Sequence, residues 1–240
     1  MIGTMVIAIR ELRSFFRLPV GWVVIALFVL LMGAGFSVAI IQPGQPATLR
    51  TLFGWGWWMM LVIAPAVSMR LLSEELRAGT IEPLATAPLG DLSIVLGKYL
   101  GGVLFLVCLL VPTAAYPIAL HLLSDPAPDI GPILAGYLAL LLSGLVYLAF
   151  GLVGSALTSS QTLAYLGSLL AIIGIWLLST EVADRAPEWL APWLVRLDVG
   201  KPVAQLARGE VTTTAIAGPL LGTIWLLCLA YVCLGWRRWR

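Results

Sequence analysis

Residues 130–180 read IGPILAGYLALLLSGLVYLAFGLVGSALTSSQTLAYLGSLLAIIGIWLLST. This stretch decides the fold because it is 51 residues long and contains no Asp, Glu, Lys or Arg. One helical crossing of a bilayer takes about 20 residues. A helix of 51 residues would be roughly 77 Å long, whereas the hydrocarbon layer is about 30 Å thick. The stretch must therefore cross a membrane twice, with a turn at its most polar point, Thr158–Gln161.

Charge is scarce in the rest of the chain as well. Of its 240 residues, 60% are hydrophobic and 11% are charged, and the mean hydropathy is +1.01. A soluble domain has about 25% charged residues. The composition therefore predicts an all-α, polytopic membrane protein that forms a single transmembrane domain over residues 1–240. Six crossing helices are predicted over residues 19–41, 52–70, 97–123, 132–157, 162–180 and 215–236.

Lys and Arg are distributed unevenly between the two sides of this arrangement. Both termini and the segment between the second and third crossings share one side, which carries nine of the fourteen basic residues. The other side carries five of them. The side richer in Lys and Arg is normally the cytoplasmic one. We therefore expect a multi-pass protein of the cell membrane with both termini in the cytoplasm.

Two segments outside the crossings are amphipathic. Over residues 1–18, apolar side chains recur at helical spacing while Arg10, Arg13 and Arg17 lie toward the other face. This pattern predicts a helix in the inner headgroup layer; a simple basic flank of the first crossing is the alternative. Over residues 181–214, Trp and Leu alternate with charged residues between prolines, which predicts an external segment lying on the outer leaflet.

Aromatic and proline residues mark two further features of the crossings. Trp55, Trp57 and Trp58 lie at the outer end of the second crossing. We interpret them as an aromatic belt at the interface, with a substrate-lining cluster as the alternative. Prolines inside crossings remove a backbone donor and tend to kink the helix, so they are either candidate hinges or static kinks. The candidate hinges are Pro65, Pro112 and Pro117.

The cytoplasmic segment 71–91 joins the second and third crossings. Gly79 is predicted to end one helix, and Pro88 to end a short second helix that follows it. Two such short helices are too small for a domain but suit a contact element for another protein. Lys98 lies one to two turns into the third crossing, where its long side chain is expected to reach the inner headgroups.

No catalytic, cofactor or metal site is expected in this chain. His121 is the only histidine, the three cysteines lie in apolar runs, and the interiors of the crossings carry no Asp, Glu, Lys or Arg. These absences argue against an intramembrane hydrolase and against ion-coupled transport. Residues 90–98 lack P-loop spacing, so ATP is not expected to bind here. The net charge of +2 gives no reason to expect a nucleic-acid partner.

The inner segment carries a resemblance to a known family. Glu74-Glu75-Leu-Arg77-Ala-Gly79-Thr80-Ile-Glu82-Pro-Leu-Ala-Thr-Ala-Pro88, followed by Gly97-Lys98, resembles the inner loop of ABC-2 type transporter permeases. Three more segments, at 15–25, 151–161 and 208–211, are similar to the gliding-motility-type permeases of that family. Nitrous-oxide-reductase maturation permeases share the architecture and are a close alternative. Pro83 is a departure, because a Leu-like residue is expected there.

The resemblance implies the permease subunit of an ATP-driven ABC exporter. Such a subunit forms the pathway as a homodimer or with a related second permease, among membrane lipids of a prokaryotic plasma or inner membrane. ATP and Mg are bound by a separate ATPase subunit that docks on a cytoplasmic coupling helix, so this chain is not expected to be an enzyme. The implied docking residues are Glu74, Glu75, Arg77, Gly79, Thr80, Glu82 and Pro88. The alternatives are a non-transporting membrane anchor for a cytoplasmic ATPase complex and an accessory-factor maturation transporter.

Overall fold

The computed structural model of this chain describes residues 2–39, 48–79, 90–187, 189, 194 and 198–238. Nearly all of these residues are helical, and no strand occurs among them. The helices are α1 (Ile2–Arg17), α2 (Pro19–Ala39), α3 (Arg50–Ala78), α5 (Asp91–Leu110), η1 (Val111–Ala114), α6 (Ala115–Leu123), α7 (Ile130–Leu157), α8 (Gln161–Leu177), η2 (Leu178–Val182), η3 (Ala183–Arg185), α10 (Gly200–Leu206) and α11 (Thr213–Arg238).

The described residues contain six helical stretches that are long and apolar enough to cross a membrane. The predicted all-α fold with six crossings is therefore confirmed. The turn predicted at residues 158–161 is also present, because α7 ends at Leu157 and Ser160 caps the start of α8. The six stretches are Pro19–Val38, Arg50–Ala78, Leu92–Leu123, Ile130–Leu157, Gln161–Val182 and Thr213–Trp236.

Two crossings differ from their predicted form. The second was expected to end near residue 70, but α3 continues as one helix to Ala78, about two turns further. The third is not one α-helix: α5 gives way to the 3-10 turn η1, in which Pro112 occupies the first turn, and then to α6. Proline suits the start of a helical segment, where its missing N–H costs no hydrogen bond.

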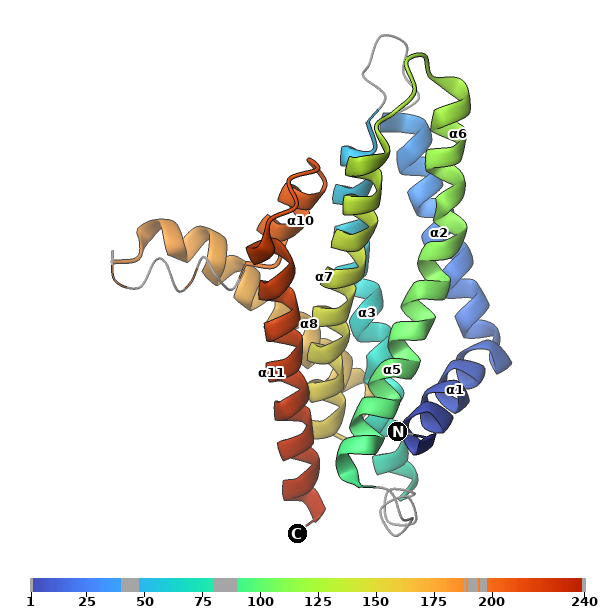
Figure 1. Cartoon of the computed structure of the whole chain (residues 1–240). Coiled ribbons are helices and arrows are strands. Elements are labelled where there is room, and N and C mark those ends of the chain that lie inside the picture. The colour runs from blue at the N-terminus through green and yellow to red at the C-terminus, as the bar shows by residue number, and fades with distance from the viewer. Residues whose placement is uncertain are drawn as a thin grey trace.

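The bundle is arranged around α7 (Figure 1). α7 packs most extensively against α3 and α11, and also contacts α5, α8 and α10. Aromatic contacts and buried hydrogen bonds hold these helices in register: the Phe53 and Tyr137 rings meet edge to face, and the Tyr99 hydroxyl donates to the Leu145 carbonyl across 3.0 Å. α3 and α7 thus form the centre of the core, with the other crossings around them.

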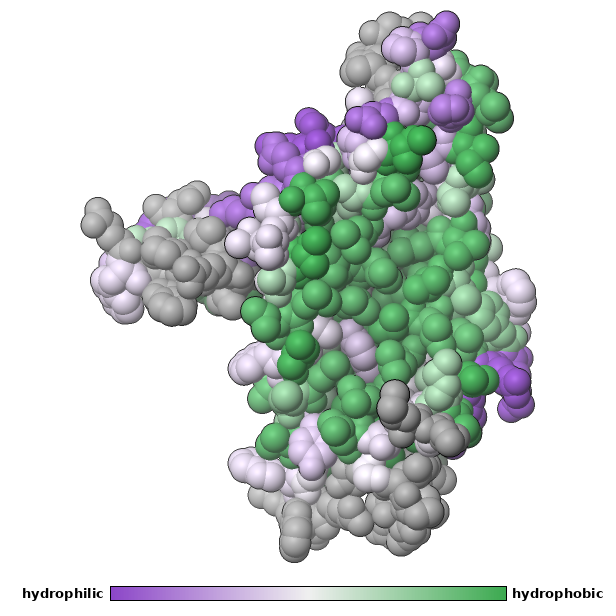
Figure 2. All heavy atoms as spheres, viewed as in Figure 1, coloured by the Kyte–Doolittle hydropathy of each residue, from purple (hydrophilic) through white to green (hydrophobic). Residues whose placement is uncertain are grey.

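The outer helices leave much apolar surface uncovered. Only 22% of the residues in the most apolar window of α2, of α8 and of α11 are buried, whereas 56–61% are buried in the other three crossings. Figure 2 shows a broad hydrophobic surface on one face of the bundle, with polar residues gathered toward its upper end. Surface of this kind is stable only against lipid or another apolar partner.

The two ends of the bundle gather different segments. One end holds the start of α3, residues 128 and 129 before α7, and residues 207 and 208 after α10, which line a common cavity. The other end holds α1, the last turns of α3, the start of α5 and the C-terminal end of α11 (Figure 1). The chain therefore starts and finishes its six crossings on the same side.

The segment expected to be external, 181–214, is described in part. It comprises the end of the π-helical turn η2, the short turn η3, and α10; residues 188, 190–193 and 195–197 lie outside the described part. In Figure 1 the end of α8, with η2 and η3, leans away from the bundle, while α10 packs against α3, α7 and α11. Its place on the outer leaflet stays a prediction.

Candidate functional site

α3 and α5 bracket residues 80–89, where the docking element is predicted. α3 ends at Ala78 because Gly79 adopts a left-handed conformation with φ +67°, and its N–H donates to the Glu75 carbonyl. Glycine is the usual residue at such a helix end because it has no Cβ to clash. The predicted helix end at Gly79 is confirmed. The predicted short second helix and the docking residues Thr80, Glu82 and Pro88 lie outside the described residues.

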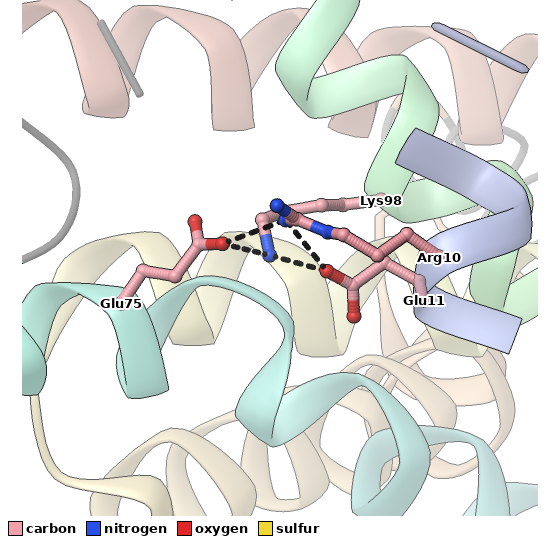
Figure 3. A network of polar contacts seen from close by, with 4 residues as sticks. All are labelled: Arg10, Glu11, Glu75 and Lys98. Carbon is pink, nitrogen blue, oxygen red and sulfur yellow. Dashed lines mark hydrogen bonds and ion pairs between the residues drawn. The ribbon is translucent and has the colours of Figure 1, made fainter. Parts of the chain in front are cut away.

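Beside these helix ends, four charged side chains from three helices form an ion-pair network (Figure 3). Lys98 Nζ on α5 lies 3.0 Å from Oε1 of Glu11 on α1 and 3.0 Å from Oε1 of Glu75 on α3. Arg10 Nη2 lies 3.2 Å from the same Glu75 oxygen and 3.4 Å from Glu11 Oε1. Two cations and two carboxylates are thus brought together, and their formal charges cancel.

Lys98 is the buried centre of this network. Its side chain is only 2% exposed, whereas that of Arg10 is 53% exposed. A charge taken out of water is tolerated when opposite charges and hydrogen bonds replace the lost hydration. The expectation that Lys98 reaches the headgroups is therefore wrong: the two carboxylates hold its ammonium group inside the protein. Lys98 joins α5 to both α1 and α3.

Two glycines allow α1 to lie directly on α5. A Cβ at Gly97 would come within 2.7 Å of the Ile7 Cβ, and a Cβ at Gly101 within 2.5 Å of the Glu11 Cβ and 3.0 Å of the Ala8 carbonyl oxygen. Residues four apart lie on one face of a helix, so the pair forms a flat strip on α5 that admits the neighbouring backbone. This close approach places Glu11 within reach of Lys98.

Arg70 ties α3 to α1 one and a half turns before Glu75. Its Cζ lies 3.9 Å from the centroid of the Phe15 ring, and that ring stacks on Phe105 of α5 at 4.6 Å. A guanidinium over an aromatic face is attracted by the ring quadrupole. α1 is therefore attached to both α3 and α5 at two levels, by ion pairs near its middle and by aromatic contacts near its end.

The predicted docking residues that the structure describes differ in exposure. Glu74, Arg77 and Gly79 are exposed at the end of α3, where another protein can reach them. Glu75 is different, because its Oε1 is engaged by Lys98 and Arg10, and its buried Oε2 has no hydrogen-bond partner among the described residues. Its attachment within the chain was not predicted, and the docking role of all four residues stays a prediction.

The three candidate hinge prolines have different surroundings. α3 runs through Pro65 without a break, and Ser68 Oγ donates to the carbonyls of Ala64 and Pro65 at 2.9 and 3.3 Å. Pro112 begins the 3-10 turn between α5 and α6, and Pro117 lies within α6. Only Pro112 coincides with a change of helix type. The role of the three prolines, as hinges or as static kinks, stays a prediction with both alternatives open.

The signals for the network were weak in the sequence. Arg10, Glu11 and Lys98 were not among the predicted site residues, and Lys98 lies 87 positions from Glu11. The spacing of Gly97 and Gly101 was the one available sign that a helix lies on this face of α5. No group of three or more His, Cys, Asp or Glu in the described part of the chain is arranged to hold a metal ion.

Comparison with known proteins assigns the family. Residues 57–230 match the ABC-2 family transporter protein family, and this match covers well over half of the chain. The chain belongs to that family and is a multi-pass transmembrane ABC transporter permease. It is also 28% identical over 193 residues to the "Probable ABC transporter permease protein NosY" of Stutzerimonas stutzeri, a match that covers 73% of this chain and 68% of that protein.

This assignment confirms the resemblance to ABC-2 permeases seen in the sequence. Members of an ABC permease family work with ATP-binding subunits, so an ATPase is the implied partner. The finer assignment to the gliding-motility type stays a prediction.

Proposed function

We propose that this chain is the permease subunit of an ATP-driven exporter in a prokaryotic plasma or inner membrane, with both termini in the cytoplasm. A separate ATPase subunit binds ATP and Mg²⁺ and carries out hydrolysis, while this chain has no catalytic role. The ATPase docks at the end of the bundle that holds the ion-pair network. The distribution of basic residues supports the cytoplasmic location of that end.

The observation that carries the proposal is that Lys98 joins α1, α3 and α5. Of these helices, α3 precedes residues 80–89 in the chain and α5 follows them. A partner that moves this segment acts on the end of α3 and the start of α5 together. α1 moves with them because two carboxylates bind one buried ammonium group. The three helices thus form a single element on which an ATPase can push.

α3 carries such a movement across the membrane. It is unbroken from Arg50 at one end of the bundle to Ala78 at the other, and α7 packs along it. Packed helices transmit shifts as rigid bodies rather than by bending gradually. Displacement at Glu75 therefore reaches the opposite end of the bundle through α3, with Pro112 a candidate hinge in the adjoining crossing.

Two permease subunits enclose the pathway in this proposal. The sparse burial of α2, α8 and α11 supports it, because each has apolar surface for a second copy, a related permease or lipid. The interfacial position of α1 is also part of the proposal. Met5 and Val6 of α1 are 54% and 60% exposed, while Ile7 and Ala8 are buried on α5. One side of α1 is thus free to enter the headgroup layer.

Copurification with the ATPase tests the docking site. We expect Glu74→Arg and Glu82→Arg each to reduce the ATPase recovered with the tagged permease, because reversing a charge in a docking surface weakens association. Glu181→Arg is the matched control, since Glu181 is an exposed acid near the opposite end of the bundle. Unchanged recovery and unchanged ATPase rates for both docking variants would exclude this surface.

The same complex in lipid vesicles separates a transporter from a membrane anchor. A coupled permease changes the rate of ATP hydrolysis by its partner, because its own conformational change is part of the cycle. An anchor leaves that rate equal to the rate of the free ATPase at the same concentration. Equal rates would reject the exporter proposal even if the two proteins copurify.

A further inference from the structure

Two adjoining cavities lie at the end of the bundle opposite the ion-pair network. The larger, of about 380 Å³, lies between the start of α3 and α10, and the smaller, of about 110 Å³, between the start of α3 and the start of α7. Arg50, Ala207 and Arg208 line both, so we treat them as one site and call it the Arg50 cleft. The larger cavity has the size of a ligand pocket. We infer that this cleft binds the phosphate of an anionic lipid headgroup.

Cations outnumber acids in the Arg50 cleft. Arg50, Lys201 and Arg208 line the larger cavity, and none of the three has an ion-pair partner in the described part of the chain. The acid that lines it, Asp198, already accepts hydrogen bonds from the backbone N–H groups of residues 200 and 201, at 2.7 and 3.3 Å. Unpaired cations around a cavity attract an anion.

The smaller cavity has one acid and an uncapped helix start. Asp129 accepts a hydrogen bond from the Gly131 N–H at 3.1 Å. Leu49 occupies the N-cap of α3 and lines the same cavity, and it provides no side-chain cap. The first N–H groups of a helix have no partner within it and carry a positive partial charge. The start of α3 therefore adds backbone donors to the charge of Arg50.

The wall of the larger cavity is aromatic and apolar. Trp57 and Trp176 line it together with small residues of α10. Trp57 is 8% exposed, and its indole Nε1 is buried beside the Tyr147 hydroxyl. The rings of Trp57 and Trp176 therefore give the cavity an apolar wall. The cleft thus combines donors and cations with an apolar wall.

This combination fits a phospholipid better than a free phosphate. Arg binds phosphate oxygens through paired N–H donors, so Arg50 and Arg208 are suited to hold the lipid phosphate. Free phosphate would use these groups but not the indole walls. The cleft also lies at the ends of membrane-crossing helices, where Trp is typical of the headgroup level and lipid phosphates are abundant. The inference does not depend on ATPase docking, which occurs at the other end of the bundle.

Lipid binding to the full-length protein in neutral detergent tests the inference. The probes are phosphatidylglycerol, diacylglycerol with the same chains but no phosphate, and glycerol 3-phosphate without chains; the readout is the Kd from native mass spectrometry titrations. We expect phosphatidylglycerol to bind at least about tenfold more tightly than either analogue, since hydrogen bonds to charged groups and chain burial both contribute. Equal affinity of glycerol 3-phosphate and the lipid would reject a lipid as the ligand.

Variants connect that binding to the cleft. We expect Arg50→Gln to weaken phosphatidylglycerol binding about tenfold and Lys201→Gln to weaken it less, because Lys acts as a point charge. Arg185→Gln removes one exposed positive charge outside the cleft and should leave the Kd unchanged. Lys201→Gln keeps the test valid if Arg50→Gln does not fold. Unchanged binding in the folded cleft variants, or equal weakening in Arg185→Gln, would overturn the inference.

Discussion

At the scale of single residues, Lys98 is the most informative position. The sequence showed that it lies near the start of a crossing, and for an isolated helix the headgroups are the obvious partner. The structure provides two carboxylates instead, at 3.0 Å each. These partners belong to two other helices, so no spacing along one helix reveals them. The position of the charge was predictable from sequence, but its environment was not.

Replacing Lys98 should destabilise the protein strongly. Lys98→Met leaves the carboxylates of Glu11 and Glu75 close together with only the exposed Arg10 beside them. Removing one partner of a buried ion pair costs about 3–5 kcal/mol. We expect a clearly lower unfolding temperature of the purified protein in detergent, and loss of ATPase stimulation in vesicles.

Two comparisons make this prediction specific. Arg13→Met removes an exposed charge on α1 that has no ion pair among the described residues and should have little effect. Adding Glu75→Gln to Lys98→Met should recover part of the lost stability, because it removes one of the unpaired carboxylates. The network would have no structural role if Lys98→Met melted at the temperature of the parent protein.

At the scale of elements, α1 is an amphipathic helix whose apolar residues are divided between contact with α5 and the exposed surface. Its periodicity predicted a helix at the membrane interface, and α1 is helical over Ile2–Arg17. Hydrophobicity alone does not distinguish a lipid surface from a neighbouring helix, because both are apolar. In the structure, Ile7 and Ala8 contact α5, while Met5 and Val6 remain exposed.

The strip on α5 should be intolerant of even one extra carbon atom. In Gly101→Ala the new Cβ would lie 2.5 Å from the Glu11 Cβ and 3.0 Å from a backbone carbonyl oxygen, so α1 must shift. Overpacking of this kind costs about 1–3 kcal/mol, and we expect a lower unfolding temperature. Gly167→Ala on α8 is the matched control, because a Cβ there meets no atom within 4 Å.

Alanine is the better helix former, so Gly167→Ala should be neutral or slightly stabilising. If Gly101→Ala behaved in the same way, α1 would not lie against α5 at this point. The attachment of α1 would then have to come from the ion pairs alone.

At the scale of the whole molecule, the sequence predicted the number of crossings but not which ones are neighbours. Long uncharged runs give the count because only a bilayer tolerates them. The central place of α7 leaves no comparable signal, since its surroundings and those of a lipid-facing helix are equally apolar. The polar connections predicted at residues 124–131 and 158–161 are present between crossings, at residues 124–129 and 158–160.

Accessibility of single cysteines tests the proposed orientation. In a variant without Cys108, Cys228 and Cys233, Arg208→Cys should react with a membrane-impermeant maleimide on intact cells. Arg77→Cys should react only after the membrane is opened, because the two positions are exposed at opposite ends of the bundle. The reverse pattern would place the ion-pair network outside the cell and exclude a cytoplasmic ATPase as its partner.

The internal cancellation of charge around Lys98 has a consequence for how ionic strength acts on this transporter. Dissolved salt screens exposed charges far more than charges enclosed by protein, and a neutral cluster attracts few counter-ions. Contacts of an ATPase with exposed residues such as Glu74 and Arg77 should weaken as salt is added. The attachment of α1 to α3 and α5 should persist. Added salt would therefore release the ATPase and leave these three helices joined.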